Sequence, residues 1–414
     1  MGDAPYPLRP VTDDELDHFF RVLSRAFGED IRPEEIVLER LTAEADRTLA
    51  AFDGDELIAT AGAFTFDLAV PGARLPAAGV TYVGVAPTHR RRGVLTSMMQ
   101  RQLHDIHDRG EPVAVLWASE SSIYGRYGYG VASRRMDIEV ERVHGRLRPD
   151  LAVDESIELR IVPPSAIRAE VEAIERAVVD ERPGQFVRDA RWIDTVLADL
   201  ECRRHGRSET RGVLATRDGR AVGYATYSEK PGAIRGHALS DGDVSVIAQR
   251  ALDPAAELAL TRLLLSLDLM RRVRWWNQPI DSPIPHLLAD PRQAKSILTD
   301  GLHARIVDVP SALSGRRYSR PVDVTIAVAD DRCPWNAGAW RLTAGADGAA
   351  TCERSDAAAD VTLEIEALGA AYLGGTSLAS LAAAGRVSTT EPLRLDELSL
   401  AFGWSREPWC PVIF

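Results

Sequence analysis

The residues with the clearest chemical potential are an arginine run followed by a glycine, Arg90-Arg91-Arg92-Gly93. A glycine at the start of a helix lets backbone amides approach a phosphate closely, and the helix dipole and the guanidinium groups both favour an anion there. A charge run by itself is more often a solvated basic turn. Here the run lies between a strand-like stretch and a helix-like stretch, and this position favours a pyrophosphate site.

A second group follows a short apolar run, where three tyrosines alternate with three glycines within Trp117–Gly130. Tyr124 is the candidate general acid. A phenol with a reference pKa near 10 can return a proton to a leaving thiolate, whose reference pKa is about 8.5, if the transfer is tuned or concerted. The alternative is that Tyr124, Tyr127 and Tyr129 are packing aromatics in a glycine-rich turn. The loop upstream favours the catalytic interpretation.

The chain ends in the apolar, proline-containing segment Pro408–Phe414. Most chains end in polar, frayed residues, so we expect this end to dock inside the protein and to bring its carboxylate with it. Desolvation would raise the pKa of that carboxylate from its reference of about 3.5 toward values useful for deprotonating an ammonium. The alternative is a hydrophobic tail that only seals an interface, and the residues alone favour that alternative.

The elements that position these groups follow from local patterns. A hairpin is predicted over Arg47–Phe66 with a turn at Asp53-Gly54, and a strand over Gly79–Val85. Helical spacing runs through Arg90–Arg109, and Val113–Trp117 is typical of a buried strand. This order implies a crossover connection in a mixed sheet.

The hairpin pattern recurs over Gly212–Tyr227, so two copies of one domain type are expected. The helix that follows the second copy has Asp253 as its expected N-cap, Pro254 at its first position and Glu257 at the expected capping-box position. It has no glycine or arginine at its start. From about Ser311, strand-like stretches over residues 322–328, 340–344 and 361–367 and an Ala-rich helix that ends near Gly385 predict a third αβ unit.

Composition bounds the function class. A chain of 414 residues is expected to form two or three domains. The net charge of −12 argues against nucleic-acid binding and makes a cationic small partner easier to accommodate. The four cysteines show no zinc-site spacing, so reduced thiols and no metal site are expected. No apolar run of membrane length and no secretory signal are present, which predicts a cytoplasmic protein without membrane association.

The segment Arg90–Leu95 resembles the Q/R-x-x-G-x-G/A pyrophosphate loop of the GNAT acetyltransferases. It departs from that pattern in having Val94 and Leu95 where many members have Gly and Ala, which implies a bulkier loop. The resemblance implies that backbone groups of Val83–Val85 contact the pantetheine arm of acetyl-CoA, next to a bulge that leaves room for the thioester carbonyl.

The stretch Ser119–Gly130 is similar to the S-E-x-x-I-Y-G-R-[FY]-G-Y-G segment of the Eis-type (enhanced intracellular survival) acetyltransferases of actinobacteria, and this resemblance covers the whole chain. It implies an α/β fold with mixed sheets, in which two tandem GNAT-like domains precede a sterol-carrier-protein-like domain. The predicted boundaries are residues 1–148 for the catalytic domain, 149–305 for a silent GNAT-like domain, and 306–414 for a domain whose terminus reaches the active site. Carboxylates at Asp253 and Glu257, where phosphate would sit, give a physical reason for that silence.

The same resemblance implies direct acetyl transfer, with the carboxylate of Phe414 as base and Tyr124 as acid. The residues implied to contact CoA are Val83, Gly84, Val85, Arg91, Arg92, Gly93, Val94, Leu95, Thr96, Ser119 and Glu120. His89 and Arg90 are expected at the periphery. Phe27, Glu29 and Asp30 fall in the early helix-to-loop region that lines acceptors in GNAT folds. They are the hypothesis for holding a polycation.

The implied reaction is acetylation of a primary amine of a cationic small molecule or a lysine side chain, with aminoglycosides and polyamines as candidate acceptors and a homohexamer as the expected assembly. Two alternatives remain open at this stage. One is a lipid or small-ligand binding protein, based on the C-terminal domain. The other is a structural assembly protein with a vestigial CoA site.

Overall fold

The protein is represented by a computed structural model that describes residues 6–232 and 240–414. The chain divides into two compact units. The first contains the described residues up to Arg134 together with Asp180–Phe186 and Asp300–Phe414; the second contains the described residues of Arg135–Val179 and Val187–Thr299. No helix of the described residues is long and apolar enough to cross a membrane.

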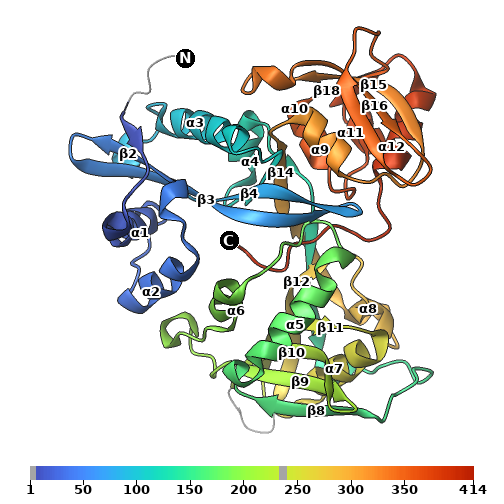
Figure 1. The fold of residues 1–414 in the computed structure, drawn as a ribbon. Coiled ribbons are helices and arrows are strands. Elements are labelled where there is room, and N and C mark those ends of the chain that lie inside the picture. The colour runs from blue at the N-terminus through green and yellow to red at the C-terminus, as the bar shows by residue number, and fades with distance from the viewer. Residues whose placement is uncertain (1–5, 233–239) are drawn as a thin grey trace. The chain divides into compact units, whose positions relative to one another are not determined.

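A seven-stranded mixed sheet forms the centre of the first unit, in the order β1-β2-β3-β4-β5-β14-β6 (Figure 1). Its strands are β1 (Leu8–Arg9), β2 (Thr48–Asp53), β3 (Glu56–Val70), β4 (Ala73–Val85), β5 (Val113–Trp117), β6 (Gly130–Val131) and β14 (Leu302–Ile306). The hairpin predicted at Asp53-Gly54 is confirmed as β2–β3, because Gly54 adopts a φ of +59° that suits the turn. The predicted crossover is also confirmed, since β4 pairs with β5 in parallel.

Helices cover both faces of this sheet: α1 (Leu16–Ala26), α2 (Pro33–Thr42), α3 (Val94–Asp108) and α4 (Ser121–Tyr124). Figure 1 shows α1 and α2 on one side of the β3–β4 hairpin and α3 on the other. The predicted helical spacing is confirmed, because α3 buries Met98, Met99, Leu103 and Ile106. It begins at Val94 and not at Arg90, since the residues just before it leave the right-handed helical region.

The C-terminal part of the first unit is built on a five-stranded sheet in the order β17-β16-β15-β18-β19. Its elements are β15 (Val322–Ala329), β16 (Gly338–Ala344), β17 (Ala350–Arg354), β18 (Val361–Glu364) and β19 (Val387–Thr389), with α9 (Val309–Gly315), α10 (Ile365–Ala371), α11 (Leu378–Ala383) and α12 (Pro392–Phe402). The predicted third αβ unit is therefore present. The strand expected over residues 361–367 is shorter, because Ile365 begins a buried helix and a short apolar run fits either structure.

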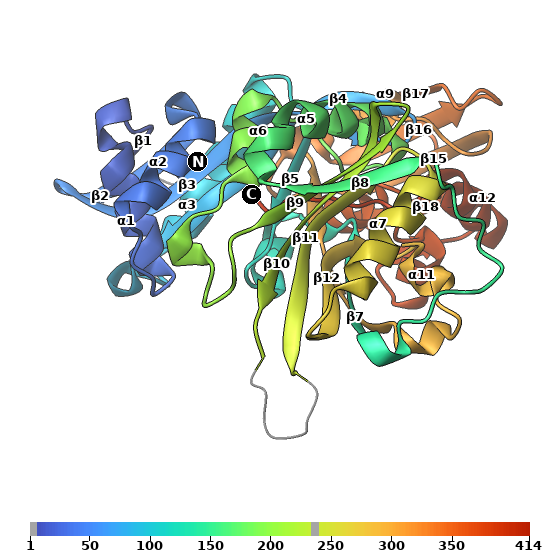
Figure 2. The ribbon, with the colours of Figure 1, turned by 90° about the horizontal axis from the view of Figure 1, so that it is seen from below.

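The second unit has its own seven-stranded sheet, in the order β13-β7-β12-β11-β10-β9-β8. Its elements are β7 (Arg134–Glu141), β8 (Ile157–Val162), β9 (Arg211–Arg217), β10 (Arg220–Lys230), β11 (Gly242–Ala251), β12 (Met270–Pro279) and β13 (Lys295–Asp300), with α5 (Arg168–Val178), α6 (Ala190–Leu197), α7 (Pro254–Ser266) and α8 (Ile284–Leu287). Figure 2 shows α7 on one face and α5 with α6 on the other. The β9–β10 hairpin confirms the second copy of the pattern.

The start of α7 matches the sequence prediction only in part. Asp253 caps the helix by accepting hydrogen bonds from the amides of Ala255 and Ala256. The predicted capping box is wrong, since Glu257 lies one position too far along the helix and its carboxylate instead accepts a hydrogen bond from Gln249 Nε2 at 2.9 Å. A carboxylate at the cap occupies the place where a phosphate would need free amides.

The chain passes from the first large sheet to the second and then returns to the first. After β6 completes the edge of the first sheet, β7 starts the second, and the chain later returns so that β14 lies between β5 and β6. Neither sheet is therefore built from one contiguous stretch.

Candidate active site

The arginine-glycine segment forms a tight loop at the start of α3. Arg91 has a φ of +63° and Gly93 a φ of +83°, which are left-handed conformations that bring successive amides to one side of the loop. The first turn of α3 carries no side-chain cap within the described residues, and Arg91 and Arg92 are exposed. A helix start without a side-chain cap, preceded by two exposed arginines, fits the pyrophosphate of CoA.

The bulky residues at the two departures from the family pattern point into the core. Val94 is buried in an apolar cluster with Met98, and Leu95 packs against the cluster that contains Tyr124. The expectation of a bulkier loop is therefore wrong for Val94, whose side chain is buried beneath the loop, whereas Leu95 is half-buried.

Two residues predicted at the periphery tie the loop to its surroundings. Arg90 donates hydrogen bonds to the carbonyl oxygens of Val85, at 3.2 Å, and of Ala26, at 2.8 Å. His89 is buried, and its Nε2 lies 3.2 Å from Asp53 Oδ2. Arg90 thus joins the end of α1 to the end of β4.

A bulge interrupts β4 where the pantetheine strand was expected. The register with β3 shifts between Thr60 and Gly62, and Tyr82 adopts a φ of +57°. The Thr60 hydroxyl donates a hydrogen bond of 2.7 Å to the Tyr82 carbonyl oxygen, which holds the bulge open. The backbone of Val83–Val85 follows directly.

Beside this bulge, β4 and β5 separate. Their parallel pairing runs from Ala77 and Val113 to Val80 and Leu116, whereas β4 continues to Val85. Ligands of open α/β sheets bind at the carboxyl ends of parallel strands where neighbouring strands diverge. The predicted CoA contacts Ser119 and Glu120 are exposed and follow the end of β5.

Tyr124 ends α4 and is 6% exposed. It shares an apolar cluster with Ala63 and Val80, on the face of the sheet that α3 covers. Burial raises the pKa of the Tyr124 phenol to about 12, with smaller contributions from Tyr127 and Glu120. The phenol therefore keeps its proton throughout the neutral range.

The chain end lies against the opposite face of the same strands. The ring of Phe414 lies 4.9 Å from that of Phe66 and 6.3 Å from that of Phe64. These ring contacts confirm that the C-terminus docks on the protein, and Figure 1 shows the chain end beside β3 and β4. Because Ala63 and Phe64 are consecutive in β3, Tyr124 and Phe414 approach the strand from opposite faces.

A strap that sequence reasoning missed holds the C-terminal tail. The Trp409 amide donates to the Pro183 carbonyl at 2.8 Å, and the Gly184 amide donates to the Ala69 carbonyl of β3 at 2.8 Å. Phe186 stacks on Phe66 at 3.9 Å and meets the ring of Phe414 at 5.9 Å. The turn pair Pro183-Gly184 was the signal available in the sequence.

We expect Gly184→Ala to lower kcat roughly 10-fold by displacing the tail, since misplacement by about 1 Å can cost on the order of 100-fold. Gly184 has a φ of +93°, and an added Cβ would lie 3.2 Å from the Trp409 carbonyl oxygen. Steady-state rates of CoA release measure the effect. Gly110→Ala is the matched control, because Gly110 has a φ of +74° but no atom within 4 Å of an added Cβ. Equal losses in both variants would assign the effect to backbone strain alone.

The three predicted acceptor residues lie on the loop after α1. Phe27 is 51% exposed, and Glu29 and Asp30 are exposed. The loop starts beside the bulge, because a Cβ on Gly84 would lie 3.2 Å from that of Ala26. The structure does not bring the three side chains into one closed wall.

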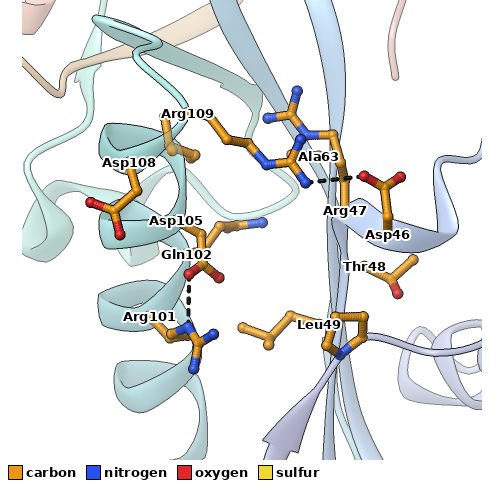
Figure 3. A pocket seen from close by; sticks show the side chains of 12 residues that line it. Asp46, Arg47, Thr48, Leu49, Ala63, Arg101, Gln102, Asp105, Asp108 and Arg109 are labelled. Carbon is orange, nitrogen blue, oxygen red and sulfur yellow. Dashed lines mark hydrogen bonds and ion pairs between the residues drawn. The ribbon is translucent and has the colours of Figure 1, made fainter.

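A separate hollow of about 320 Å³ lies between α3 and β2 (Figure 3). Four of its charged side chains pair with one another: Arg109 donates to Asp46 at 3.0 Å and Arg101 to Asp105 at 2.7 Å. None of the predicted site residues lines it. Among residues 6–232 and 240–414, no group of three or more His, Cys, Asp and Glu could hold a metal ion.

Comparison with known families assigns each part of the chain. Sequence models of the acetyltransferase (GNAT) domain match residues 7–132 and 184–306, and the sterol carrier protein domain matches residues 309–411. These matches, with the mixed sheets and the loop before α3, define the protein as a GNAT acetyltransferase, the class of enzyme that uses acetyl-CoA.

The relatives narrow this class. An N-acetyltransferase named as uncharacterized from Streptomyces avermitilis is 43% identical over 98% of both chains. N-acetyltransferase Eis of Mycobacterium bovis is 35% identical over 94% of this chain and 95% of its own. The crystal structure of Eis1 from Mycobacterium abscessus has a TM-score of 0.84 at 32% identity and covers 99% of this chain and 100% of that one. The chain belongs to the Eis-type GNAT N-acetyltransferases.

Proposed function

We propose that the protein transfers the acetyl group of acetyl-CoA directly to a primary amine of a cationic acceptor, an aminoglycoside, a polyamine or a lysine side chain. The observation that carries the proposal is the docked chain end, with the Phe414 ring against Phe64 and Phe66 beside the β4 bulge. In this proposal the carboxylate of Phe414 serves a reaction centred where β4 and β5 separate.

The CoA site in this proposal follows the loop and the fork. The pyrophosphate contacts the first-turn amides and side chains of Arg91–Thr96, and the pantetheine arm runs along Val83–Val85. Ser119 and Glu120 contact CoA after β5. The thioester carbonyl then lies at the fork, which is accessible from both faces of the sheet.

In the proposed reaction the base and the acid act from opposite faces of the sheet. The Phe414 carboxylate takes a proton from the acceptor ammonium, and the free amine attacks the thioester carbon. As the carbon–sulfur bond breaks, the Tyr124 hydroxyl gives its proton to the thiolate. The second nitrogen proton passes to solvent as the amide forms, the phenolate of Tyr124 takes a proton back from solvent, and the Phe414 carboxyl releases its proton to solvent. No covalent enzyme intermediate is needed.

Tyr124 gives the reaction an expected pH profile. A general acid must be protonated, and burial raises the pKa of Tyr124 to about 12, so its proton is lost only as the pH rises through that value. We therefore expect kcat not to fall between about pH 8 and pH 10. The check is a kcat profile for the native chain and Tyr124→Phe. An alkaline decrease near pH 9 that the Phe variant lacks would contradict this assignment.

The acceptor assignment rests on the acidic loop after α1. We expect the double substitution Glu29→Gln and Asp30→Asn to raise the acceptor KM by roughly 10-fold with little change in kcat, since exposed charges contribute to encounter and binding. Initial rates with a multiply charged acceptor and with a monoamine measure it. An unchanged KM for both acceptors would remove these two residues from the acceptor site.

The function is tested by CoA release from acetyl-CoA with a panel of aminoglycosides, polyamines and lysine peptides. Turnover with any of these amines supports the transferase. Binding of acetyl-CoA without turnover of any amine would leave a vestigial site, and lipid binding without acetyl-CoA binding would favour a carrier. The assay also identifies the acceptor class.

Assembly and location remain proposals drawn from the family resemblance. We propose a homohexamer that acts in the cytoplasm. Light scattering coupled to size-exclusion chromatography measures the mass against the 45.2 kDa of one chain. A single-chain mass at working concentration would overturn the hexamer.

A further inference from the structure

A buried ion pair links the C-terminal domain to the tyrosine turn, the segment Tyr124–Tyr129. Arg305 Nη2 donates to both carboxylate oxygens of Asp330, at 2.8 Å each, and the two side chains are 0% and 1% exposed. Arg305 Nε donates a hydrogen bond of 2.9 Å to the carbonyl oxygen of Tyr127. One guanidinium thus joins a carboxylate of the C-terminal domain to the backbone three residues after Tyr124.

The Asp330 carboxylate is fully engaged by its own domain. It accepts hydrogen bonds from the amides of Arg332 and Cys333, at 3.1 Å each, and from Asn336 Nδ2 at 3.0 Å. These bonds leave it little freedom to move, so it fixes the guanidinium in turn. The ion pair is a rigid connection and not a loose surface contact.

The turn itself is short enough to transmit this restraint. The Gly128 amide donates to the Gly125 carbonyl at 2.9 Å, and the Tyr129 amide donates to the Tyr124 carbonyl at 3.3 Å. A Cβ on Gly128 would lie 2.7 Å from Arg305 Nε, so the guanidinium lies directly against the backbone of the turn. A shift of the Tyr127 carbonyl therefore moves Tyr124.

We propose that Asp330, acting through Arg305, is a positioning residue for the Tyr124 hydroxyl, so that the C-terminal domain sets the geometry of proton return to the thiolate. This inference rests on the proposed role of Tyr124. It gives the C-terminal domain a part in catalysis in addition to supplying the last residue of the chain. Because neither Asp330 nor Arg305 is assigned to acetyl-CoA, their effect is expected on kcat and not on donor binding.

The test is a double-mutant cycle between Asp330→Asn and Tyr124→Phe, measured as kcat and as KM for acetyl-CoA. We expect Asp330→Asn to lower kcat roughly 10-fold. This is a part of the rate enhancement of a positioned general acid, which is on the order of 100-fold. The KM for acetyl-CoA should change less than about 3-fold. In the Tyr124→Phe background, Asp330→Asn should cause no further loss, because the group it positions is absent.

A matched control separates positioning from general damage to the fold. Arg47 and Glu111 form a second buried ion pair, with side chains 3% and 6% exposed, and Arg47 also donates to the Thr65 hydroxyl of β3. Glu111→Gln should lower the thermal midpoint as much as Asp330→Asn does and leave kcat near the native value. If Asp330→Asn is not recovered folded, Arg305→Lys enters the same cycle, because a lysine keeps the charge but cannot serve both Asp330 and the Tyr127 carbonyl.

Each outcome decides the proposal. Losses of kcat that multiply in the double variant would overturn it, as would an equal loss of kcat in Glu111→Gln. A Tyr124→Phe enzyme with native kcat would remove the general acid of the proposed function, and this inference with it. A lower kcat in Tyr124→Phe, together with a native kcat in Asp330→Asn, would overturn this inference alone. The proposed function would still stand.

Discussion

A chain that carries one extra glycine after Phe414 should lose on the order of 10²- to 10⁴-fold in kcat, the range typical of a positioned general base. The added residue moves the free carboxylate by about 3.5 Å. It leaves in place the ring contacts that Phe414 makes with Phe66 and Phe186. The measurement is CoA release at saturating acetyl-CoA and acceptor. The loss should shrink as the pH approaches the pKa of the acceptor amine, because less of the amine then needs a base.

Phe414→Leu is the control for the extension. It keeps the terminal carboxylate but removes the aromatic contacts, so it should cost much less than the added glycine. Equal activity of the native and extended chains would leave acetyl transfer standing and move the base to another group. Inactive native and extended chains would favour a binding or structural role.

Gly130→Ala should have the largest effect on stability among single methyl additions near the site. A Cβ at Gly130 would lie 2.1 Å from the Glu366 carbonyl oxygen and 2.5 Å from the Ala370 amide nitrogen, both in the backbone of α10. Backbone atoms of a helix cannot move aside as a flexible side chain can, so β6 and α10 must separate. We expect a loss of about 3 kcal/mol, seen as a fall of roughly 5–10 °C in the thermal midpoint.

The tyrosine turn just before β6 supplies the comparison. Gly125 has ordinary helical angles, and an added Cβ there would come no closer than 3.9 Å to the Glu366 side chain. Gly125→Ala should therefore leave the thermal midpoint within about 1 °C of the native value. Similar midpoints for Gly125→Ala and Gly130→Ala would show that close packing against α10 does not stabilise the fold.

The parts of the fold that were predicted from sequence have local causes. The Asp53-Gly54 pair indicates its own hairpin, and the spacing of apolar residues indicates α3, because neighbours along the chain decide both structures. The docked end was also predictable, since an apolar tail ending at Phe414 has few other places to bury its surface. The family resemblance, and not the spacing of residues, supplied the role of its carboxylate.

The parts that were not predicted depend on residues far apart in the chain. Arg305 meets the tyrosine turn across 178 residues, and no local pattern indicates that this buried arginine will pair with Asp330. The strap at Gly184 and the insertion of β14 are of the same kind. The expected bulkier loop at Val94 was wrong because that side chain points into the core. The residue type alone does not give the direction of the side chain.

The position of β14 also bears on how the protein is made. The first sheet lacks its sixth strand in spatial order until Leu302–Ile306 have been translated, so the N-terminal domain leaves the ribosome with β5 unpaired along one edge. A chain truncated before Leu302 should therefore expose this edge of β5 and associate through it.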